Sequence, residues 1–189
     1  MKMKLTNSFV LVAVILLALT LSGCGSSMMT RVARMDAPSD GYALVSFVRP
    51  SVFGGAIKFG LWDSDKFIGI LTAKSVVQYK VKPGKHLFIA RAENWSYVEA
   101  DLAAGKHYVI VGRVFPGVWK ARVGMDPANS PEETRADVTK FVNRLNPIGV
   151  MEGTREPYES ARVDHVKKAI DKFQAGEVKY ATLSADAGI

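Results

Sequence analysis

The chain has 189 residues and a formal net charge of +7, and 48% of its residues are hydrophobic. Its one cysteine, Cys24, excludes an intrachain disulfide. Once an apolar N-terminal segment is set aside, the remaining length is enough for one domain, or for one domain with an appendage.

The first 23 residues are organised like a bacterial secretory signal. Lys2 and Lys4 supply a positive start, and the aliphatic segment 9–21 is too short for a membrane span, which needs about 20 residues. Small residues then lead into Cys24, and the sequence Leu-Ser-Gly-Cys that ends there resembles the lipobox of bacterial lipoproteins. The resemblance implies cleavage between Gly23 and Cys24 and acylation of the Cys24 sulfur, which anchors the mature chain in a membrane.

The same resemblance implies a location and a set of partners. Gly25, rather than an aspartate, follows Cys24, and in this class that favours the outer membrane, facing the periplasm, over the inner membrane. We therefore predict contact with a membrane through the lipid on Cys24, with another envelope protein, peptidoglycan or an anionic lipid as further partners. Nucleic acid is not expected as a partner of an exported, anchored protein.

Charge is unevenly divided along the mature chain. Residues 24–125 contain 14 basic and 7 acidic residues, whereas residues 126–189 contain 9 basic and 11 acidic residues. The basic part lies against anionic headgroups, attracts the acidic part of the chain, or is a solvated surface without a partner. The pattern alone leaves these three alternatives open.

The composition and the hydrophobic pattern of the sequence change after residue 40. Residues 24–40 are small and polar and predict a flexible tether. Residues 41–125 contain short runs of β-branched and aromatic residues, and their spacing of about ten residues predicts an antiparallel β-sandwich-like module, so that the fold is mainly β. The predicted strands are Tyr42–Val48, Ala56–Trp62, Lys66–Leu71, Ser75–Val81, Lys85–Ala92, Trp95–Leu102, Lys106–Val114 and a weaker run, Val118–Val123.

The residue patterns of two of these segments also predict which of their faces are buried. Residues 77–81 alternate between apolar and polar, which gives one buried face and one wet face that carries Lys80. Residues 107–112 are apolar on both faces. They therefore predict a central strand, with Val109 and Val111 in the core.

A helical pattern follows in residues 126–189. Ser130 is a predicted N-cap, with Pro131 at the first helical position and Glu133 closing a capping box, and Asn146-Pro147 ends this helix. A second helix is predicted over Pro157–Ala175. Each helix has one apolar face and must dock on another surface, which gives a C-terminal two-helix appendage packed on the β module and an α+β fold overall. The apolar face of the second helix consists of Val163, Val166, Ile170 and Phe173.

Three segments of the β module carry a further resemblance. They are Ala43–Pro50 (Ala-Leu-Val-Ser-Phe-Val-Arg-Pro), Val81–His86 (Val-Lys-Pro-Gly-Lys-His) and Ala104–Tyr108 (Ala-Gly-Lys-His-Tyr). Together they resemble a family of bacterial lipoproteins that carry a small β domain of unknown function, and they are similar to PEGA-type surface modules. The likeness runs from Gly41 to Val123 and implies a fold but no activity.

The sequence contains no recognisable catalytic motif. It lacks a nucleophile elbow and a zinc-protease helix, and its Gly-Lys pairs lack the rest of a phosphate-binding loop. We therefore predict no catalytic residue, no cofactor, and a non-catalytic binding or structural role in the periplasm or at the outer membrane. The alternative is an envelope enzyme, such as a hydrolase of peptidoglycan or lipid, with a concave pocket that gathers several titratable groups.

Four residues are the candidates for binding: Arg49, Phe53, His86 and His107. The two histidines each follow a Gly-Lys pair and begin a strand, which allows them to lie side by side in adjacent strands. No tight spacing supplies a third ligand, so no metal site is predicted. Arg49 is expected to brace the end of a strand, and Phe53 is either a lid over the sandwich end or an exposed contact. The tryptophans are core residues or platforms for sugars: Trp62, Trp95 and Trp119.

Overall fold

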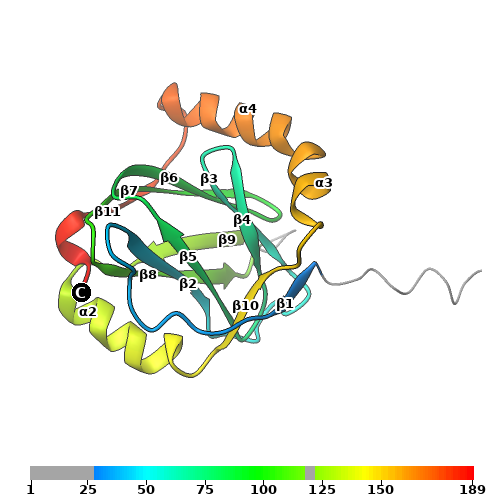
Figure 1. The fold of residues 1–189 in the computed structure, drawn as a ribbon. Helices are drawn as coiled ribbons and strands as arrows, with labels where there is room; N and C mark the ends of the chain where they lie inside the picture. The colour runs from blue at the N-terminus through cyan, green and yellow to red at the C-terminus, as the bar shows by residue number, and fades with distance from the viewer. Residues whose placement is uncertain (1–27, 118–121) are drawn as a thin grey trace, which may run out of the picture.

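The computed structural model describes residues 28–117 and 122–189. Two β-sheets pack face to face, and helices cover both outer faces of the pair (Figure 1). The predicted signal, the cleavage site at Gly23 and Cys24, and Trp119 lie outside the described residues. Within the described residues, no helix has the length and apolar character needed to cross a membrane.

The first sheet has the strand order β1-β10-β5-β2-β8-β9. Its strands are β1 (Met29–Arg31), β10 (Asn146–Val150), β5 (Ser75–Val81), β2 (Ala43–Arg49), β8 (His107–Phe115) and β9 (Arg122–Pro127). Every residue of β2 is buried, because it lies between β5 and β8 in the plane and is covered on both faces. The strand predicted to be central, β8, is its neighbour, and its first six residues are buried as expected.

The second sheet has the strand order β11-β7-β6-β3-β4. Its strands are β11 (Ala181–Leu183), β7 (Trp95–Leu102), β6 (Gly84–Arg91), β3 (Phe59–Asp63) and β4 (Lys66–Leu71). The predicted mainly β sandwich is confirmed, but both sheets are mixed rather than purely antiparallel. Pairs β2/β8, β5/β10 and β7/β11 are parallel, because the chain passes through the opposite sheet or a helical layer between their members.

The space between the sheets holds the main hydrophobic core. Alternate residues of β2, β5 and β8 face alternate residues of β3, β6 and β7 across it. At its centre the rings of Phe47 and Phe88 meet edge to face with centroids 5.2 Å apart. Such a pair adds about 0.5–1.5 kcal/mol to the contribution of the buried area.

The first predicted helix covers the outer face of the first sheet. It consists of α2 (Pro131–Asp137), which continues into the π-helical turn η1 (Val138–Val142). The Ser130 hydroxyl accepts a hydrogen bond from the Glu133 amide, as the predicted cap requires, while the Glu133 carboxylate accepts from the Asn129 amide. The apolar face of this segment packs on the sheet through a cluster formed by Val142, Leu145, Val48, Val76, Val109 and Val111.

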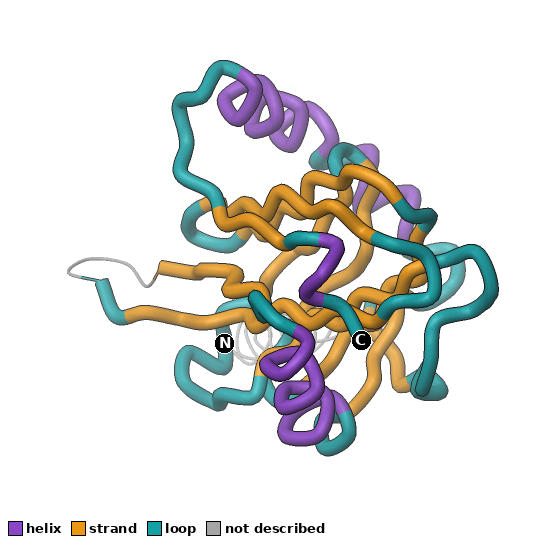
Figure 2. The backbone as a smooth tube through the Cα atoms, turned by 90° about the vertical axis from the view of Figure 1, so that its left-hand side faces the viewer, coloured by secondary structure: helices purple, strands orange, loops and turns teal. Residues whose placement is uncertain are grey.

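The second predicted helix covers the outer face of the second sheet, on the opposite side of the molecule (Figure 2). Its Val166 and Ala169 are buried against Trp62, Phe67, Leu87, Ile89 and Tyr97, so the expected docking is confirmed. It is two helices rather than one, α3 (Arg155–Ser160) and α4 (Val163–Gln174). The break falls at Arg162, whose backbone leaves the helical region (φ −130°, ψ −13°) while its guanidinium folds back over the ring of Tyr158.

The segment predicted as a flexible tether, residues 24–40, is fixed from Met28 onward. The amide of Met151 donates to the Met28 carbonyl at 2.8 Å, and β1 then pairs with β10. Further along, the side-chain amide of Gln78 bonds both the amide and the carbonyl of Met35. The tether prediction is therefore wrong for this part, because tertiary pairing overrides a local sequence that is too short and polar to indicate a strand.

The C-terminal region, residues 126–189, adds strands to its predicted helices. Strand β10 joins the first sheet beside β5, and β11 joins the second sheet beside β7. After the short 3-10 helix η2 (Ala185–Ala187), Ile189 exchanges backbone hydrogen bonds with His107 at 2.7 and 3.1 Å. The region is thus joined to both sheets by backbone hydrogen bonds as well as by apolar packing.

Truncating a central-strand valine is expected to destabilise the fold. Val109 and Val111 are buried beneath α2 and η1, so Val109→Ala or Val111→Ala leaves a cavity and lowers the free energy of unfolding by about 1–3 kcal/mol in urea titrations. Lys80→Ala is the control, because Lys80 is exposed and its ammonium lies 4.4 Å from the centroid of the Tyr42 ring. Equal losses at the three positions would contradict this assignment of strand faces.

Candidate functional site

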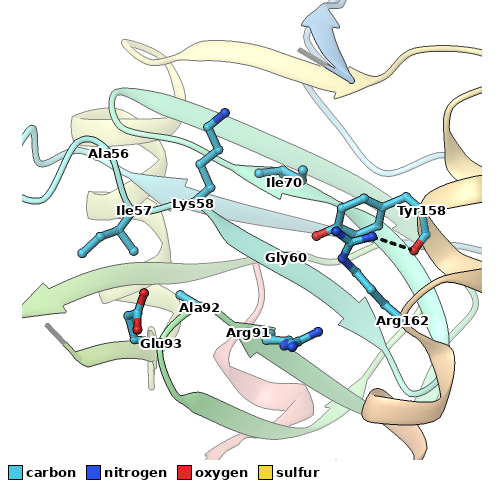
Figure 3. Close-up of a pocket in the computed structure, with 10 residues that line it drawn as sticks. All are labelled: Ala56, Ile57, Lys58, Gly60, Ile70, Arg91, Ala92, Glu93, Tyr158 and Arg162. Carbon is cyan, nitrogen blue, oxygen red and sulfur yellow. Dashed lines mark hydrogen bonds between the residues drawn. The ribbon is translucent and has the colours of Figure 1, made fainter. Parts of the chain in front are cut away.

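A cleft of about 610 Å³ opens at the edge of the second sheet (Figure 3). One wall is the segment that leads from the loop after β2 into β3, and the turn between β6 and β7 forms another. Helix α3 and the start of α4 close the far side. The lining consists of Ala56, Ile57, Lys58, Gly60, Ile70, Arg91, Ala92, Glu93, Tyr158 and Arg162.

The lining of the cleft is basic. Lys58, Arg91 and Arg162 supply three positive charges, against one carboxylate from Glu93. The described lining therefore carries an excess of positive charge.

Aromatic rings hold two of these cations in place. The guanidinium of Arg162 lies 3.8 Å from the centroid of the Tyr158 ring, and that of Arg91 lies 5.2 Å from the Trp95 ring. Arg162 also donates a long hydrogen bond of 3.5 Å to the Tyr158 carbonyl, drawn in Figure 3. The Tyr158 ring itself is packed on Phe67, with centroids 4.4 Å apart.

Glycine at position 60 keeps the floor of the cleft open. A Cβ atom there would lie 3.2 Å from the Tyr158 hydroxyl, closer than an ordinary contact. Glycine thus leaves room for the hydroxyl at the floor, beside the guanidinium of Arg162. The result is a cleft with fixed hydrogen-bond donors and positive charge, suited to an anionic group such as a phosphate or a carboxylate.

The candidate residue Arg49 organises one wall of this cleft. Its side chain is 0% exposed, and its guanidinium donates to the carbonyls of Phe53 at 3.1 Å, Gly54 at 2.7 Å and Ile57. The guanidinium also lies 4.9 Å from the ring of Phe59, and burial lowers its pKa from the usual value. Arg49 therefore braces the end of β2 and fixes the loop whose last residues line the cleft.

The candidate residue Phe53 lies at the tip of the same loop. Its side chain is 54% exposed, and the neighbouring Val52 is 66% exposed. Phe53 is thus an exposed contact rather than a lid over the sandwich. The positive φ of +64° at Gly54 lets the chain turn back directly after it, so that the Gly54 carbonyl reaches Arg49.

The candidate residue His86 lies outside the cleft, in β6. Its Nδ1 is 2.9 Å from an Asp63 carboxylate oxygen and its Nε2 is 2.9 Å from the Lys82 carbonyl, so both ring nitrogens face acceptors. The hydrogen bond to Asp63 raises the pKa of His86 despite its burial. Tyr79 donates to the same carboxylate at 3.2 Å, and its pKa is raised by burial and by Asp63. This cluster ties β5 of one sheet to β3 and β6 of the other.

The candidate residue His107 lies in β8 of the first sheet, so the expectation that it neighbours His86 is wrong. The two Gly-Lys-His segments are alike locally but enter different sheets. The Nε2 atom of His107 is 2.8 Å from the hydroxyl of Ser46, and burial lowers the pKa of His107 to about 4. Both side chains are buried, so this serine–histidine pair is closed to a substrate and belongs to the core.

The remaining groups singled out in the sequence are metal-ligating residue types and the tryptophans. The described residues contain no group of three or more His, Cys, Asp or Glu side chains placed to hold a metal ion. Trp62 is buried between the second sheet and the helices, which makes it a core aromatic, whereas Trp95 is half-buried beneath Arg91.

Four of the residues that line the cleft were not identified from the sequence: Lys58, Arg91, Tyr158 and Arg162. Only the spacing of Tyr158 and Arg162, four residues apart on a helical pattern, offered a local signal.

Comparisons with protein-family models, with curated proteins and with solved structures find no match for this chain. The likeness to small β domains of bacterial lipoproteins and to PEGA-type modules therefore stays a prediction that rests on the three quoted segments.

Proposed function

We propose that the protein is an acylated lipoprotein of the bacterial envelope, with a non-catalytic binding role at the outer membrane, facing the periplasm. The observation that supports this most directly is the hydrogen bond from the Met151 amide to the Met28 carbonyl, because it fixes in the fold a residue that comes only four positions after Cys24. An anchor at Cys24 would hold the domain near the membrane surface.

The basic cleft is the binding site in this proposal. It is concave, it gathers three cations against one carboxylate, and it displays the Tyr158 hydroxyl. Its described lining offers no serine, threonine, cysteine or histidine as nucleophile or base. A concave shape with several titratable groups is also what an envelope enzyme would have, but the cleft has Glu93 as its one lining carboxylate and lacks these nucleophiles, which favours recognition of an anionic envelope molecule over its hydrolysis.

Replacing the proposed acylation site is expected to abolish anchoring. Cys24→Ala removes the sulfur that takes the acyl chains, so the variant should remain as precursor and carry no lipid label in cells fed a labelled fatty acid. Ser26→Ala, two residues away, is the matched control and should be processed and labelled like the wild type. A Cys24→Ala protein that is processed and sediments with membranes like the wild type would refute the lipoprotein assignment.

A further inference from the structure

We propose that the basic cleft binds the phosphate group of an anionic lipid in the same membrane that holds Cys24. This inference rests on the proposed lipid anchor. It adds a ligand class to the cleft and an orientation of the domain on the bilayer.

The first step is the short distance between the anchor and the fold. Met28 is held by the hydrogen bond from the Met151 amide, and β1 begins at the next residue. Met28 is the fourth residue after Cys24, and a fully extended chain covers at most about 3.6 Å per residue, or about 14 Å over these four steps. The edge of the domain that carries β1 therefore stays within about 14 Å of the point where the lipid enters the membrane.

The second step is that the cleft lies at this edge. Ile70 lines the cleft, and its amide donates to the Met29 sulfur at 3.3 Å. Met28 and Ile70 also pack against the same two apolar clusters. A Cβ atom at Gly69, the residue before Ile70, would lie 3.1 Å from the Met29 side chain, so β1 and this strand are close together. The anchor thus holds the cleft near the headgroups rather than out in the periplasm.

The third step is the chemistry of the surface around the cleft. Lys58, Arg91 and Arg162 supply the positive charge that attracts anionic headgroups. The loop that leads into Lys58 carries Val52 and Phe53, both more than half exposed. Cations beside exposed apolar side chains are typical of surfaces that rest in the membrane interface. The hydrogen bonds from Arg49 fix this loop, so the exposed apolar side chains stay in a constant position relative to the cations of the cleft.

The proposal is tested by hydrogen exchange on the acylated mature protein in lipid nanodiscs. One set of discs contains phosphatidylcholine alone, and the other also contains phosphatidylglycerol, which bears a net negative phosphodiester. We expect the amides of residues 56–58, 91–93 and 158–162 to exchange more slowly in the anionic discs. Neutralising one cation should weaken this protection about fivefold, as expected for one basic side chain at an anionic surface.

Two variants test whether the cleft causes the effect. Arg91→Gln with Arg162→Gln should remove the protection, whereas Arg144→Gln, on the helical layer of the first sheet, should not. Protection that persists in the double variant places the lipid contact elsewhere and overturns the proposal. If the double variant fails to fold, the comparison of wild-type protein in the two kinds of disc still tests the proposal.

A last arm separates the two sources of phosphate. Inorganic phosphate added to phosphatidylcholine discs should leave exchange at the cleft unchanged. Equal protection by free phosphate overturns the assignment to a headgroup, and so does equal exchange in the two kinds of disc. Failure of the anchor itself is distinguishable, because Cys24→Ala would then fractionate like the wild type and the purified chain would carry no lipid.

Discussion

Arg49→Ala is expected to lower the free energy of unfolding by about 3–5 kcal/mol. The substitution removes the donors that satisfy the carbonyls of Phe53, Gly54 and Ile57, and it leaves a void beside the ring of Phe59. Each hydrogen bond from a charged donor contributes about 1.5–3 kcal/mol, and the desolvation cost of burying a guanidinium offsets part of the sum.

The measurement is urea unfolding followed by tryptophan fluorescence. Trp62 is buried between the second sheet and the covering helices, so its emission reports the loss of that packing. The control is Arg113→Ala, because Arg113 pairs with Asp126 at 2.9 Å but both side chains are more than half exposed. We expect a loss of less than about 1 kcal/mol there. Similar losses for the two variants would show that Arg49 does not brace the loop.

A local consequence of Arg49→Ala is expected at the cleft. The Ile57 amide donates to the Gly54 carbonyl at 2.8 Å within the loop that Arg49 clamps. Without the clamp this hydrogen bond should open more often, and the Ile57 amide should exchange faster than in the wild type. One wall of the cleft would then lose its fixed geometry, so a weaker lipid effect is expected in the nanodisc comparison.

The strands of the β module were predictable because each carries enough local information. Strands β2, β5 and β8 are seven to nine residues long and rich in β-branched and aromatic residues, and turns that contain Gly, Pro or Asp lie near their ends. The burial of Val109 was also predictable, since a strand that is apolar on both faces must be covered on both. The helix start at Ser130 was evident from its cap alone.

The remaining strands depend on tertiary contacts that leave no mark in a short window of sequence. Strand β10 contains both Pro147 and Gly149, which argue against a strand, and it forms because it fills the edge beside β5. Strands β1 and β11 have three residues each, too few for a period-two pattern to show. Two parallel pairs, β5/β10 and β7/β11, are formed by these additional strands. The third, β2/β8, forms because the chain passes through the second sheet between its two members.

The cleft was not predictable for the same reason. Lys58 and Arg162 are separated by more than half of the chain, and each lies in a segment of ordinary composition. Only the docking of α3 on the second sheet brings Tyr158 and Arg162 to Gly60. The histidines attracted attention because their residue type is chemically versatile, yet the structure uses them to join the sheets and to fill the core.

His107 is expected to lower the free energy of unfolding as the pH falls below 6.5. The pKa of the buried imidazole is lowered from 6.5 to about 4, because burial disfavours its charged form. Above pH 6.5 neither the folded nor the unfolded chain is protonated at this residue. As the pH falls from 6.5 to 4, the unfolded chain binds a proton that the folded chain excludes, so stability falls, by about 3 kcal/mol at most from this group.

The neutral ring of His107 is hydrogen-bonded inside the core. Gln78 donates to the Ser46 hydroxyl at 3.4 Å, and that hydroxyl lies 2.8 Å from Nε2 of His107. A neutral imidazole can pair with this hydroxyl in either tautomer, so the ring needs no charge to make its hydrogen bond. His86 acts in the opposite sense, since its raised pKa adds stability at low pH that is lost as the pH rises.

The contribution of His107 is isolated by comparing variants rather than by one titration. Urea unfolding at several values between pH 7 and pH 4 should give a steeper loss of stability for the wild type than for His107→Gln, which has no titrating ring. The control is His165→Gln, the same replacement at an exposed position on α4. If His107→Gln shows the same pH dependence as the wild type, the acid sensitivity arises from other groups, and the ring of His107 is not held neutral by its burial.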